Sequence, residues 1–326
     1  MMFDVLCLGN AIVDIVTHAD DAALQKYDLQ KGAMTLIDIN RAEYLYKIMN
    51  ESLEISGGSA ANTAAGIASF GGKVGFIGKV HDDQLGKTFI QDIRAVGVYY
   101  ETTPSIGGAP TARCHIFVTP DAQRTLQTYL GACVELSVAD INEQWVQSSK
   151  ITFVEGYLFD PPGARLAVKK AAKLASQSNN YFALSLSDSF CAERHRPEFK
   201  ALIKDHVHIL FANELEACSF LQTKSLDETL ERAKTLCDIV ILTRSEKGSL
   251  IIKQNDVIEI NPAKVNRVLD TTGAGDLYAA GFLYAYAQNY DLKKCGHIAS
   301  EAAGQILGHF GARPTKPLKN ILQSFL

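Results

Sequence analysis

The stretch Asp270-Thr271-Thr272-Gly273-Ala274-Gly275-Asp276 carries the most information in this sequence, because an apolar helical run, Leu277–Ala287, follows it directly. Its two glycines let the backbone approach a ligand closely, and the first N–H groups of a helix have no partners within the helix. The segment can therefore cradle an anion such as a phosphate. The positive end of the helix favours the ionised form of an aspartate in its first turn, which suits a base that takes a proton from a hydroxyl. Simple helix capping is the structural alternative.

Other phosphate-binding loops do not fit the sequence. A Walker A loop needs glycine five positions before its Gly-Lys-Ser/Thr, and His81 stands at that place before Gly86-Lys87-Thr88. A dinucleotide fingerprint that began at Gly273 would need a glycine where Tyr278 stands. The spacing therefore excludes a P-loop and gives no support to a Rossmann oxidoreductase.

Short apolar runs and helical patterns alternate along the chain. Six runs are typical of strands buried on both faces: Phe3–Leu8, Val74–Gly78, Ile151–Glu155, Tyr181–Leu186, His208–Ala212 and Ile239–Thr243. Helical spacing of apolar residues occurs at Ala60–Phe70, Leu85–Ala95, Pro162–Ser176, Pro197–Lys204, Glu214–Leu221 and Leu226–Cys237. A hairpin (Leu250–Lys253 and Val257–Ile260) and two helices (Asp276–Gln288 and Leu292–Leu307) are predicted to complete the chain. This alternation is typical of an α/β fold with a parallel sheet.

Two stretches lack the crossover helices of this pattern, Met34–Ile39 and Thr111–Tyr129. The second contains Pro120-Asp121 between two strand-like runs, which predicts a hairpin. We expect these strands to form a small second sheet. Because such a sheet packs only one face well, its other face needs a substrate or a second subunit as partner, and a lid is the simplest role.

A second glycine motif, Gly57-Gly58-Ser59-Ala60-Ala61-Asn62, lies where a strand (Leu53–Ile55) is predicted to turn into a helix. Paired glycines let backbone amides touch a substrate, and the amide of Asn62 can bond a pair of hydroxyls. Upstream, Asn10 and Asp14 follow the first strand. A carboxylate beyond a core strand can accept hydrogen bonds from vicinal hydroxyls, although Asp14 alone is equally well explained as a loop residue.

Composition narrows the classes of partner. The chain has 326 residues with 32 basic and 36 acidic side chains, a net charge of −4, and no basic cluster, which argues against binding nucleic acid or anionic lipid. No apolar run is long enough to span a bilayer, and no secretory signal is recognisable, so we expect a cytoplasmic protein without membrane contact. The seven scattered cysteines predict reduced thiols rather than disulfides or zinc ligands.

Four motifs, taken together, carry a resemblance to a known family: Gly57-Gly58 with Asn62, Gly75-Phe76-Ile77-Gly78 with Asp83 and Gly86, Asn213-Glu214-Leu215-Glu216, and Asp270–Asp276. Their order resembles that of the ribokinase-like (PfkB) carbohydrate and nucleoside kinases over most of the chain. The resemblance implies one kinase domain over residues 1–326, with a three-layer α/β/α core. It also implies a small β-sheet lid from segments within about 10–40 and 98–130.

The resemblance also implies the catalytic roles. Asp276 would be the base, and the preceding Gly273, Ala274 and Gly275 would form the anion hole. Asn213 and Glu216 would organise Mg²⁺ near the phosphates of ATP. Thr243 and Gly248 match the ends of a T-x-G-x-x-G nucleotide motif, in which Ser245 replaces the first glycine. A monovalent cation such as K⁺ near the anion hole is also part of this expectation.

Within the family the chain is similar to the adenosine kinases, the bacterial ones in particular. Arg124 resembles the lid arginine that they close onto the transferring phosphate; a solvent-exposed hairpin residue is the alternative. A planar guanidinium suits an equatorial oxyanion. Tyr157 follows Glu155-Gly156 at a place where these enzymes stack adenine, although a core tyrosine fits nearly as well. The implied acceptor-binding residues are Asn10, Asp14, Gly57, Gly58, Ser59, Asn62 and Tyr157.

The implied activity is phosphotransfer from ATP to an alcohol group, with the 5′-hydroxyl of adenosine as acceptor. A sugar kinase acting on a ribose- or fructose-like acceptor is the alternative, and it predicts a polar wall opposite Asp14. A nucleoside-binding regulator without catalysis is a third possibility, which the intact Asp276 argues against. The partners are small molecules, and the protein is expected to be a monomer or a homodimer joined through the lid.

Overall fold

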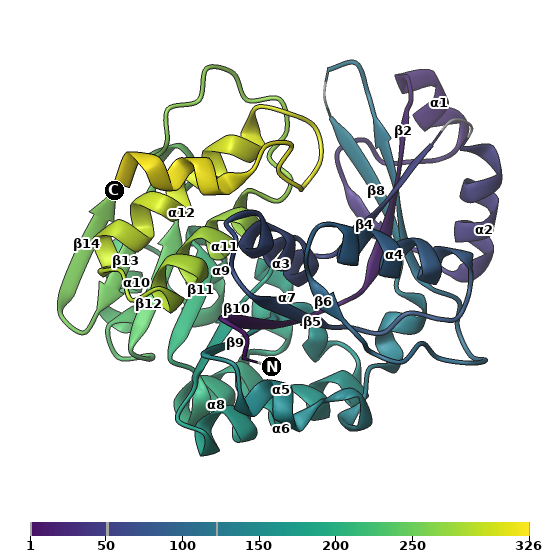
Figure 1. Ribbon diagram of the computed structural model, residues 1–326. Coiled ribbons are helices and arrows are strands. Elements are labelled where there is room, and N and C mark those ends of the chain that lie inside the picture. Colours follow the sequence, from purple (N-terminus) through teal and green to yellow (C-terminus); the bar gives the residue numbers. More distant parts are fainter. Residues whose placement is uncertain (1, 50–51, 122, 326) are drawn as a thin grey trace.

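The computed structural model describes residues 2–49, 52–121 and 123–325, in which two β-sheets are joined side by side (Figure 1). The larger sheet has the strand order β14-β13-β12-β11-β10-β9-β1-β5-β6. Its strands are β1 (Val5–Leu8), β5 (Val74–Ile77), β6 (Tyr99–Tyr100), β9 (Ile151–Glu155), β10 (Tyr181–Ser185), β11 (Ile209–Asn213), β12 (Ile239–Thr243), β13 (Ser249–Lys253) and β14 (Asp256–Ile260). The strands from β12 to β6 pair in parallel, and the β13–β14 hairpin pairs antiparallel. All six predicted core strands are confirmed.

Helices cover both faces of this sheet, because successive strand residues point into different apolar clusters. Val5 and Cys7 of β1 join one cluster, and Leu6 and Leu8 join the other. The first cluster is completed by α3 (Ser59–Ser69), α4 (Gln84–Ala95), α11 (Ala274–Ala287) and α12 (Leu292–Leu307). The second is completed by α5 (Glu143–Gln147), α6 (Pro162–Gln177), α7 (Ser189–Arg194), α8 (Arg196–His206), α9 (Glu214–Leu221) and α10 (Leu226–Ala233). The core is therefore the expected three-layer α/β/α arrangement.

The smaller sheet has the order β3-β8-β7-β2-β4. Its strands are β2 (Ile12–His18), β3 (Met34–Leu36), β4 (Leu53–Gly57), β7 (Ala112–Val118) and β8 (Arg124–Tyr129). The helices α1 (Asp21–Lys26) and α2 (Ile39–Ile48) supply Leu24 and Leu45, which pack with Val13, Ile15 and Phe117 on one face. The opposite face turns toward the core domain.

The smaller sheet, which the sequence predicts to be a lid and which is called the lid below, differs from the sequence prediction in four respects. Asp38 caps α2 by accepting a hydrogen bond from the Arg41 backbone N–H, so the expected strand Met34–Ile39 ends at Leu36. Asp14 lies within a lid strand, because β2 continues the chain directly after β1. The lid also recruits β4, which lies outside the expected segments 10–40 and 98–130. Conversely, Tyr99–Tyr100 pairs with β5 in the large sheet.

Other expectations can be compared with the described residues. The seven cysteines are all free thiols, as predicted. The helix expected at Leu226–Cys237 ends at Ala233. Within the described part of the chain, no helix has both the length and the apolar character that a membrane crossing requires.

Candidate active site

The loop that the sequence predicts to bind an anion, Asp270–Asp276, lies between β14 and α11 and continues into the first turn of α11. Gly273 adopts the left-handed φ of +77° and immediately precedes α11, whose first residue is Ala274. A Cβ at Gly273 would come within 2.8 Å of Ala312, so this position needs glycine on both counts. A Cβ at Gly275 would meet nothing within 4 Å. Space is therefore open beside Gly275, whereas the Ala274 N–H donates to the Thr271 backbone oxygen at 3.2 Å.

Asp276, in the first turn of α11, is held by the second glycine motif. Its Oδ1 accepts a hydrogen bond from Ser59 Oγ at 2.6 Å, and its Oδ2 accepts one from Asn62 Nδ2 at 3.0 Å. Burial raises the pKa of Asp276 to about 6, and these two hydrogen bonds and the charge of Arg313 oppose that rise. The side chain is therefore ionised at neutral pH but is a better proton acceptor than an exposed aspartate.

The loops expected to bind the acceptor meet close to Asp276. Gly58 has a φ of +100°, and a Cβ there would clash with the backbone oxygen of Asn10. A Cβ at Gly57 would clash with the carboxylate of Asp14. The Oδ1 atom of Asn10 is buried without a hydrogen-bond partner among the described residues, so it is available to a ligand. Burial raises the pKa of Asp14 to about 6 against the opposing charges of Arg124 and Arg313.

Glu155 ties these loops together, and our reading of the sequence gave it no role. Its Oε1 accepts a hydrogen bond from the Asn10 backbone N–H at 2.9 Å, and its Oε2 accepts one from the Ala60 backbone N–H at 2.8 Å. The side chain is 1% exposed, and burial raises its pKa to about 7. Its position at the end of an otherwise apolar strand could have indicated a role, because a carboxylate is buried only where hydrogen-bond donors satisfy it.

Arg124 reaches from the lid into the anion loop. Its Nη1 lies 3.0 Å from Asp270 Oδ2, and the two side chains are 9% and 4% exposed. Asp270 also accepts hydrogen bonds from the backbone N–H groups of Thr272 and Gly311. The alternative of a solvent-exposed hairpin arginine is therefore wrong. The lid is docked on the core through this ion pair.

The face of the lid sheet that carries Asp14 is largely apolar. Side chains on a strand alternate between faces, so Ile12 and Val16 share a face with Asp14. The pairing of β2 with β7 and of β7 with β8 shows which side chains of the neighbouring strands lie on the same face. They are Cys114, Ile116, Val118, Leu126, Thr128 and Arg124. Four of these six side chains form one apolar cluster with Ile12 and Val16, and they are Cys114, Ile116, Val118 and Leu126.

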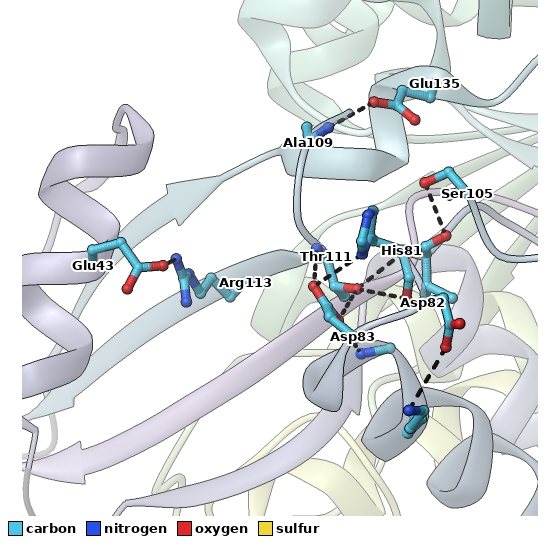
Figure 2. Close-up of polar contacts among 12 residues, drawn as sticks. Glu43, His81, Asp82, Asp83, Ser105, Ala109, Thr111, Arg113 and Glu135 are labelled. Atoms are coloured by element: carbon cyan, nitrogen blue, oxygen red, sulfur yellow. Dashed lines mark hydrogen bonds and ion pairs between the residues drawn. The ribbon is translucent and has the colours of Figure 1, made fainter. Parts of the chain in front are cut away.

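The hinge between core and lid explains the Asp83 and Gly86 motif (Figure 2). Asp83 caps α4 by accepting a hydrogen bond from the Gly86 N–H at 2.7 Å. It also accepts hydrogen bonds from the N–H and the Oγ1 of Thr111, at 2.8 and 2.6 Å, just before β7. A Cβ at Gly86 would clash with the backbone oxygen of His81. The motif therefore fixes the start of the lid strand relative to α4.

The residues expected on the nucleotide side lie at the ends of β11 and β12. Asn213 and Glu216 form a reciprocal capping box at the start of α9: Asn213 Oδ1 accepts from the Glu216 N–H, and the Glu216 carboxylate accepts from the Asn213 N–H and Nδ2. Asn213 is thus the N-cap of α9. Burial raises the pKa of Glu216 to about 7, and the described residues supply it with no cationic partner. A buried carboxylate in that state fits a hydrated Mg²⁺, which needs only one or two carboxylates besides phosphates.

The segment that departs from the T-x-G-x-x-G motif, residues 243–248, has two residues with a left-handed φ. Ser245 adopts a left-handed φ of +51°, where the usual glycine would be free of strain. Gly248 has a φ of +77°, and a Cβ there would clash with the Ile260 backbone oxygen. Thr243 ends β12 opposite Ser249. The loop therefore has left-handed residues at both Ser245 and Gly248.

Tyr157 and Asp188 both make contacts that stabilise the fold. Tyr157 packs against the second apolar cluster, and its hydroxyl donates to the Ser187 backbone oxygen at 3.3 Å. This contact matches the core alternative; the stacking role of Tyr157 stays a prediction. Asp188 caps α7 by accepting a hydrogen bond from the Cys191 backbone N–H.

Arg313, in the loop after α12, was missed by the sequence reasoning. Its Nε donates to Asn62 Oδ1 at 3.4 Å, and its Nη1 lies 3.5 Å from Asp92 Oδ2. No motif marks this residue, because its neighbours in space are distant in sequence.

Comparisons with known proteins agree with this geometry. The chain matches the family described as pfkB family carbohydrate kinase over residues 32–319. It is 46% identical to the solved adenosine kinase from Sinorhizobium meliloti, with a TM-score of 0.93 and all of both chains covered. It is also 46% identical to a solved probable sugar kinase from Rhizobium etli CFN 42, with a TM-score of 0.93 over 100% of this chain and 99% of the other. A nucleoside kinase from Methanocaldococcus jannaschii is 30% identical over 268 residues, 80% of this chain and 82% of the relative.

Proposed function

This chain belongs to the pfkB family of carbohydrate kinases and is a phosphotransferase that acts on a hydroxyl group; we propose that its acceptor is adenosine, phosphorylated by ATP on the 5′-hydroxyl. The products would be AMP and ADP. The likeness to the adenosine kinase from Sinorhizobium meliloti supports this choice of acceptor, and the probable sugar kinase from Rhizobium etli keeps a ribose- or fructose-like sugar as the alternative.

The apolar face of the lid is the observation that favours a nucleoside. A sugar kinase needs polar groups opposite Asp14, whereas the side chains beside Asp14 on the lid sheet include Ile12, Cys114 and Ile116. Apolar surface removed from water contributes roughly 25 cal/mol per Å², and a purine base offers such surface while a free sugar does not. The apolar face of the lid therefore favours a nucleoside, whose purine can contact it, over a free sugar.

The acceptor ribose would bind through the side chains of Asn10, Asp14 and Asn62. Asp14 accepts hydrogen bonds from hydroxyl groups, and the unpartnered Oδ1 of Asn10 accepts another. Ser59 and Asn62 hold Asp276 with its carboxylate fixed by both oxygens. This arrangement would place the 5′-hydroxyl beside the carboxylate of Asp276, the catalytic base.

In the transfer, Asp276 takes the proton of the 5′-hydroxyl as that oxygen bonds to the γ-phosphorus of ATP and the bond to ADP breaks. The backbone N–H groups of Gly273 and Gly275 stabilise the negative charge on the transferring group, and that of Ala274 would join them by giving up its bond to the Thr271 backbone oxygen. Arg124 would exchange its partner Asp270 for that group. Mg²⁺, held by Asn213 and Glu216, would neutralise phosphate charge, and Thr243 and Gly248 would support the nucleotide.

The test is a comparison of kcat/KM for adenosine, inosine, ribose and fructose with ATP and Mg²⁺. We expect adenosine to exceed both sugars by about 10³-fold, which corresponds to about 4 kcal/mol of base contacts. A sugar that equals adenosine would favour the sugar kinase. A monovalent cation at the anion hole, a lid-mediated homodimer and a cytoplasmic location stay predictions.

A further inference from the structure

Arg313 is a largely buried cation whose terminal nitrogens have no hydrogen-bond partner. Its side chain is 13% exposed, in the loop between α12 and the short helix η5 (Leu318–Phe325). Neither Nη1 nor Nη2 has a hydrogen-bond acceptor among the described residues, although Nη1 lies 3.5 Å from Asp92 Oδ2. An arginine is always charged and carries five N–H donors, so leaving the terminal donors unmet away from water is costly. The unpaired Nη1 and Nη2 donors of Arg313 therefore indicate that a hydrogen-bond acceptor from outside the described chain binds there.

The surroundings of Arg313 place it at the acceptor pocket. Nε contacts Asn62, and the positive charge is close enough to oppose the rise that burial causes in the pKa of both Asp14 and Asp276. These three side chains are the ones assigned to the acceptor and to its proton. The missing partner of Arg313 is thus expected where the acceptor binds.

The charges of the pocket indicate the chemical class of that partner. Asp14, Asp92 and Asp276 surround Arg313, so carboxylates outnumber the cation. An anionic acceptor would be repelled by the carboxylates, which leaves little net attraction for it. A hydroxyl group suits both kinds of neighbour, because its O–H donates to a carboxylate while its oxygen accepts from the guanidinium.

Arg313 also determines how Asn62 faces Asp276. The Oδ1 atom of Asn62 accepts from Arg313 Nε, and the Nδ2 atom of the same amide donates to Asp276 Oδ2 at 3.0 Å. Without the arginine, the amide could rotate and turn its oxygen toward the carboxylate, which would repel it. The guanidinium therefore favours the amide orientation that the base requires.

We propose that Arg313 is a further acceptor-site residue with two roles: Nη1 and Nη2 donate hydrogen bonds to hydroxyl oxygens of a neutral polyhydroxylated acceptor, and Nε orients Asn62 toward Asp276. This inference rests on the acceptor pocket of the proposed function, but it does not require that adenosine be the preferred acceptor.

The test compares Arg313→Met and Arg313→Lys with Lys316→Met, an exposed cation in the same loop. Steady-state kinetics are measured with ATP and whichever of adenosine, ribose and fructose the wild type uses best. We expect Arg313→Met to raise the acceptor KM about 10- to 100-fold, since hydrogen bonds from a charged donor are lost. The KM for ATP should change less than 3-fold, and Lys316→Met should resemble the wild type.

The pH profile of kcat supplies a readout that a purely structural role would not move. The charged groups around Asp276 are Arg313 from the C-terminal loop, Asp14 from β2 and Glu155 from β9, while α3 contributes the uncharged Ser59 and Asn62. Removing the only cation of this set should move the acidic limb to higher pH. Arg313→Lys keeps the charge, so it should restore the limb while the acceptor KM stays raised, because lysine cannot supply the same fork of donors.

The outcomes separate this inference from the proposed function. If adenosine is not an acceptor but Arg313→Met raises the KM of the sugar that is used, the proposed acceptor is wrong and Arg313 keeps its role. If Arg313→Met changes the KM of acceptor and ATP equally, or leaves the acceptor KM and the acidic limb unchanged, the inference is overturned. Should Arg313→Met not fold, as judged by circular dichroism, Arg313→Lys alone decides: an unchanged acceptor KM then refutes the two-donor role.

Discussion

Asp276→Asn removes the proton acceptor while preserving the shape of the side chain. We expect kcat to fall by about 10²- to 10⁴-fold, the usual contribution of a positioned general base. Affinity for the acceptor should be retained, because the groups assigned to the ribose are other side chains. The measurements are kcat in an assay of ADP formation and the acceptor dissociation constant by calorimetry.

The same substitution has a predictable effect on stability. Burial raises the pKa of Asp276 from 3.8 to about 6, so the folded state binds its proton more tightly than the unfolded state does. This group therefore stabilises the fold below pH 4 and loses that contribution, about 3 kcal/mol at most, as pH rises through 6. A neutral amide avoids this loss at pH 7, and it can keep both contacts: its oxygen accepts from Asn62 Nδ2, and its N–H donates to Ser59 Oγ, because a hydroxyl can also accept.

Asp276→Asn should therefore unfold at or above the wild-type temperature at pH 7 while being almost inactive. An exposed aspartate, Asp256 at the start of β14, provides the matched control, and Asp256→Asn should leave both activity and Tm unchanged. Turnover of Asp276→Asn within 3-fold of wild type would remove Asp276 from the mechanism. A loss of activity accompanied by a large fall in Tm would refute the separation of catalysis from folding.

Three further predictions concern the lid and the pH dependence. Arg124→Ala should lower kcat more than it raises the acceptor KM, because the guanidinium would meet charge chiefly in the reacting complex; a raised KM with unchanged kcat would make Arg124 a binding residue only. Ile12→Asn, at a partly buried position of the apolar face of the lid, should raise the KM for adenosine at least 10-fold and leave the KM for ATP unchanged, and equal KM values for adenosine in wild type and variant would refute a lid that binds the purine. In the wild type, kcat should fall on acidification through about pH 6 as Asp276 is protonated, and an acidic limb absent down to pH 4.5 would contradict its raised pKa.

The sequence predicted those parts of the fold in which local pattern and burial agree. Strands such as Ile151–Glu155 and Ile239–Thr243 are buried on both faces, so they read as continuous apolar runs and their bounds were predicted correctly. The glycine-rich loop before α11 could also be predicted from the sequence, because its glycines and the helix that follows are adjacent in the chain. The lid was harder: Met34–Ile39 looks like a strand until the cap formed by Asp38 is recognised.

The parts of the site that were missed are those assembled over long separations. Asn62 and Asp276 belong to recognisable motifs, but Arg313 lies 251 residues from the amide it contacts and carries no motif. Glu155 was visible only as the polar end of an apolar strand, and nothing local tells that its carboxylate binds the N–H groups of Asn10 and Ala60. Such contacts depend on how the elements pack, which no local pattern records.

A competition between acceptors tests the central claim most directly. The protein is given ATP, Mg²⁺ and equal concentrations of adenosine and ribose, and the phosphorylated products are separated and counted while less than a tenth of either acceptor is consumed. The product ratio equals the ratio of the two kcat/KM values. We predict that AMP exceeds ribose phosphate by about 10³-fold, as a base-binding lid requires. Ribose phosphate equal to or more abundant than AMP would contradict the assignment of adenosine as the acceptor.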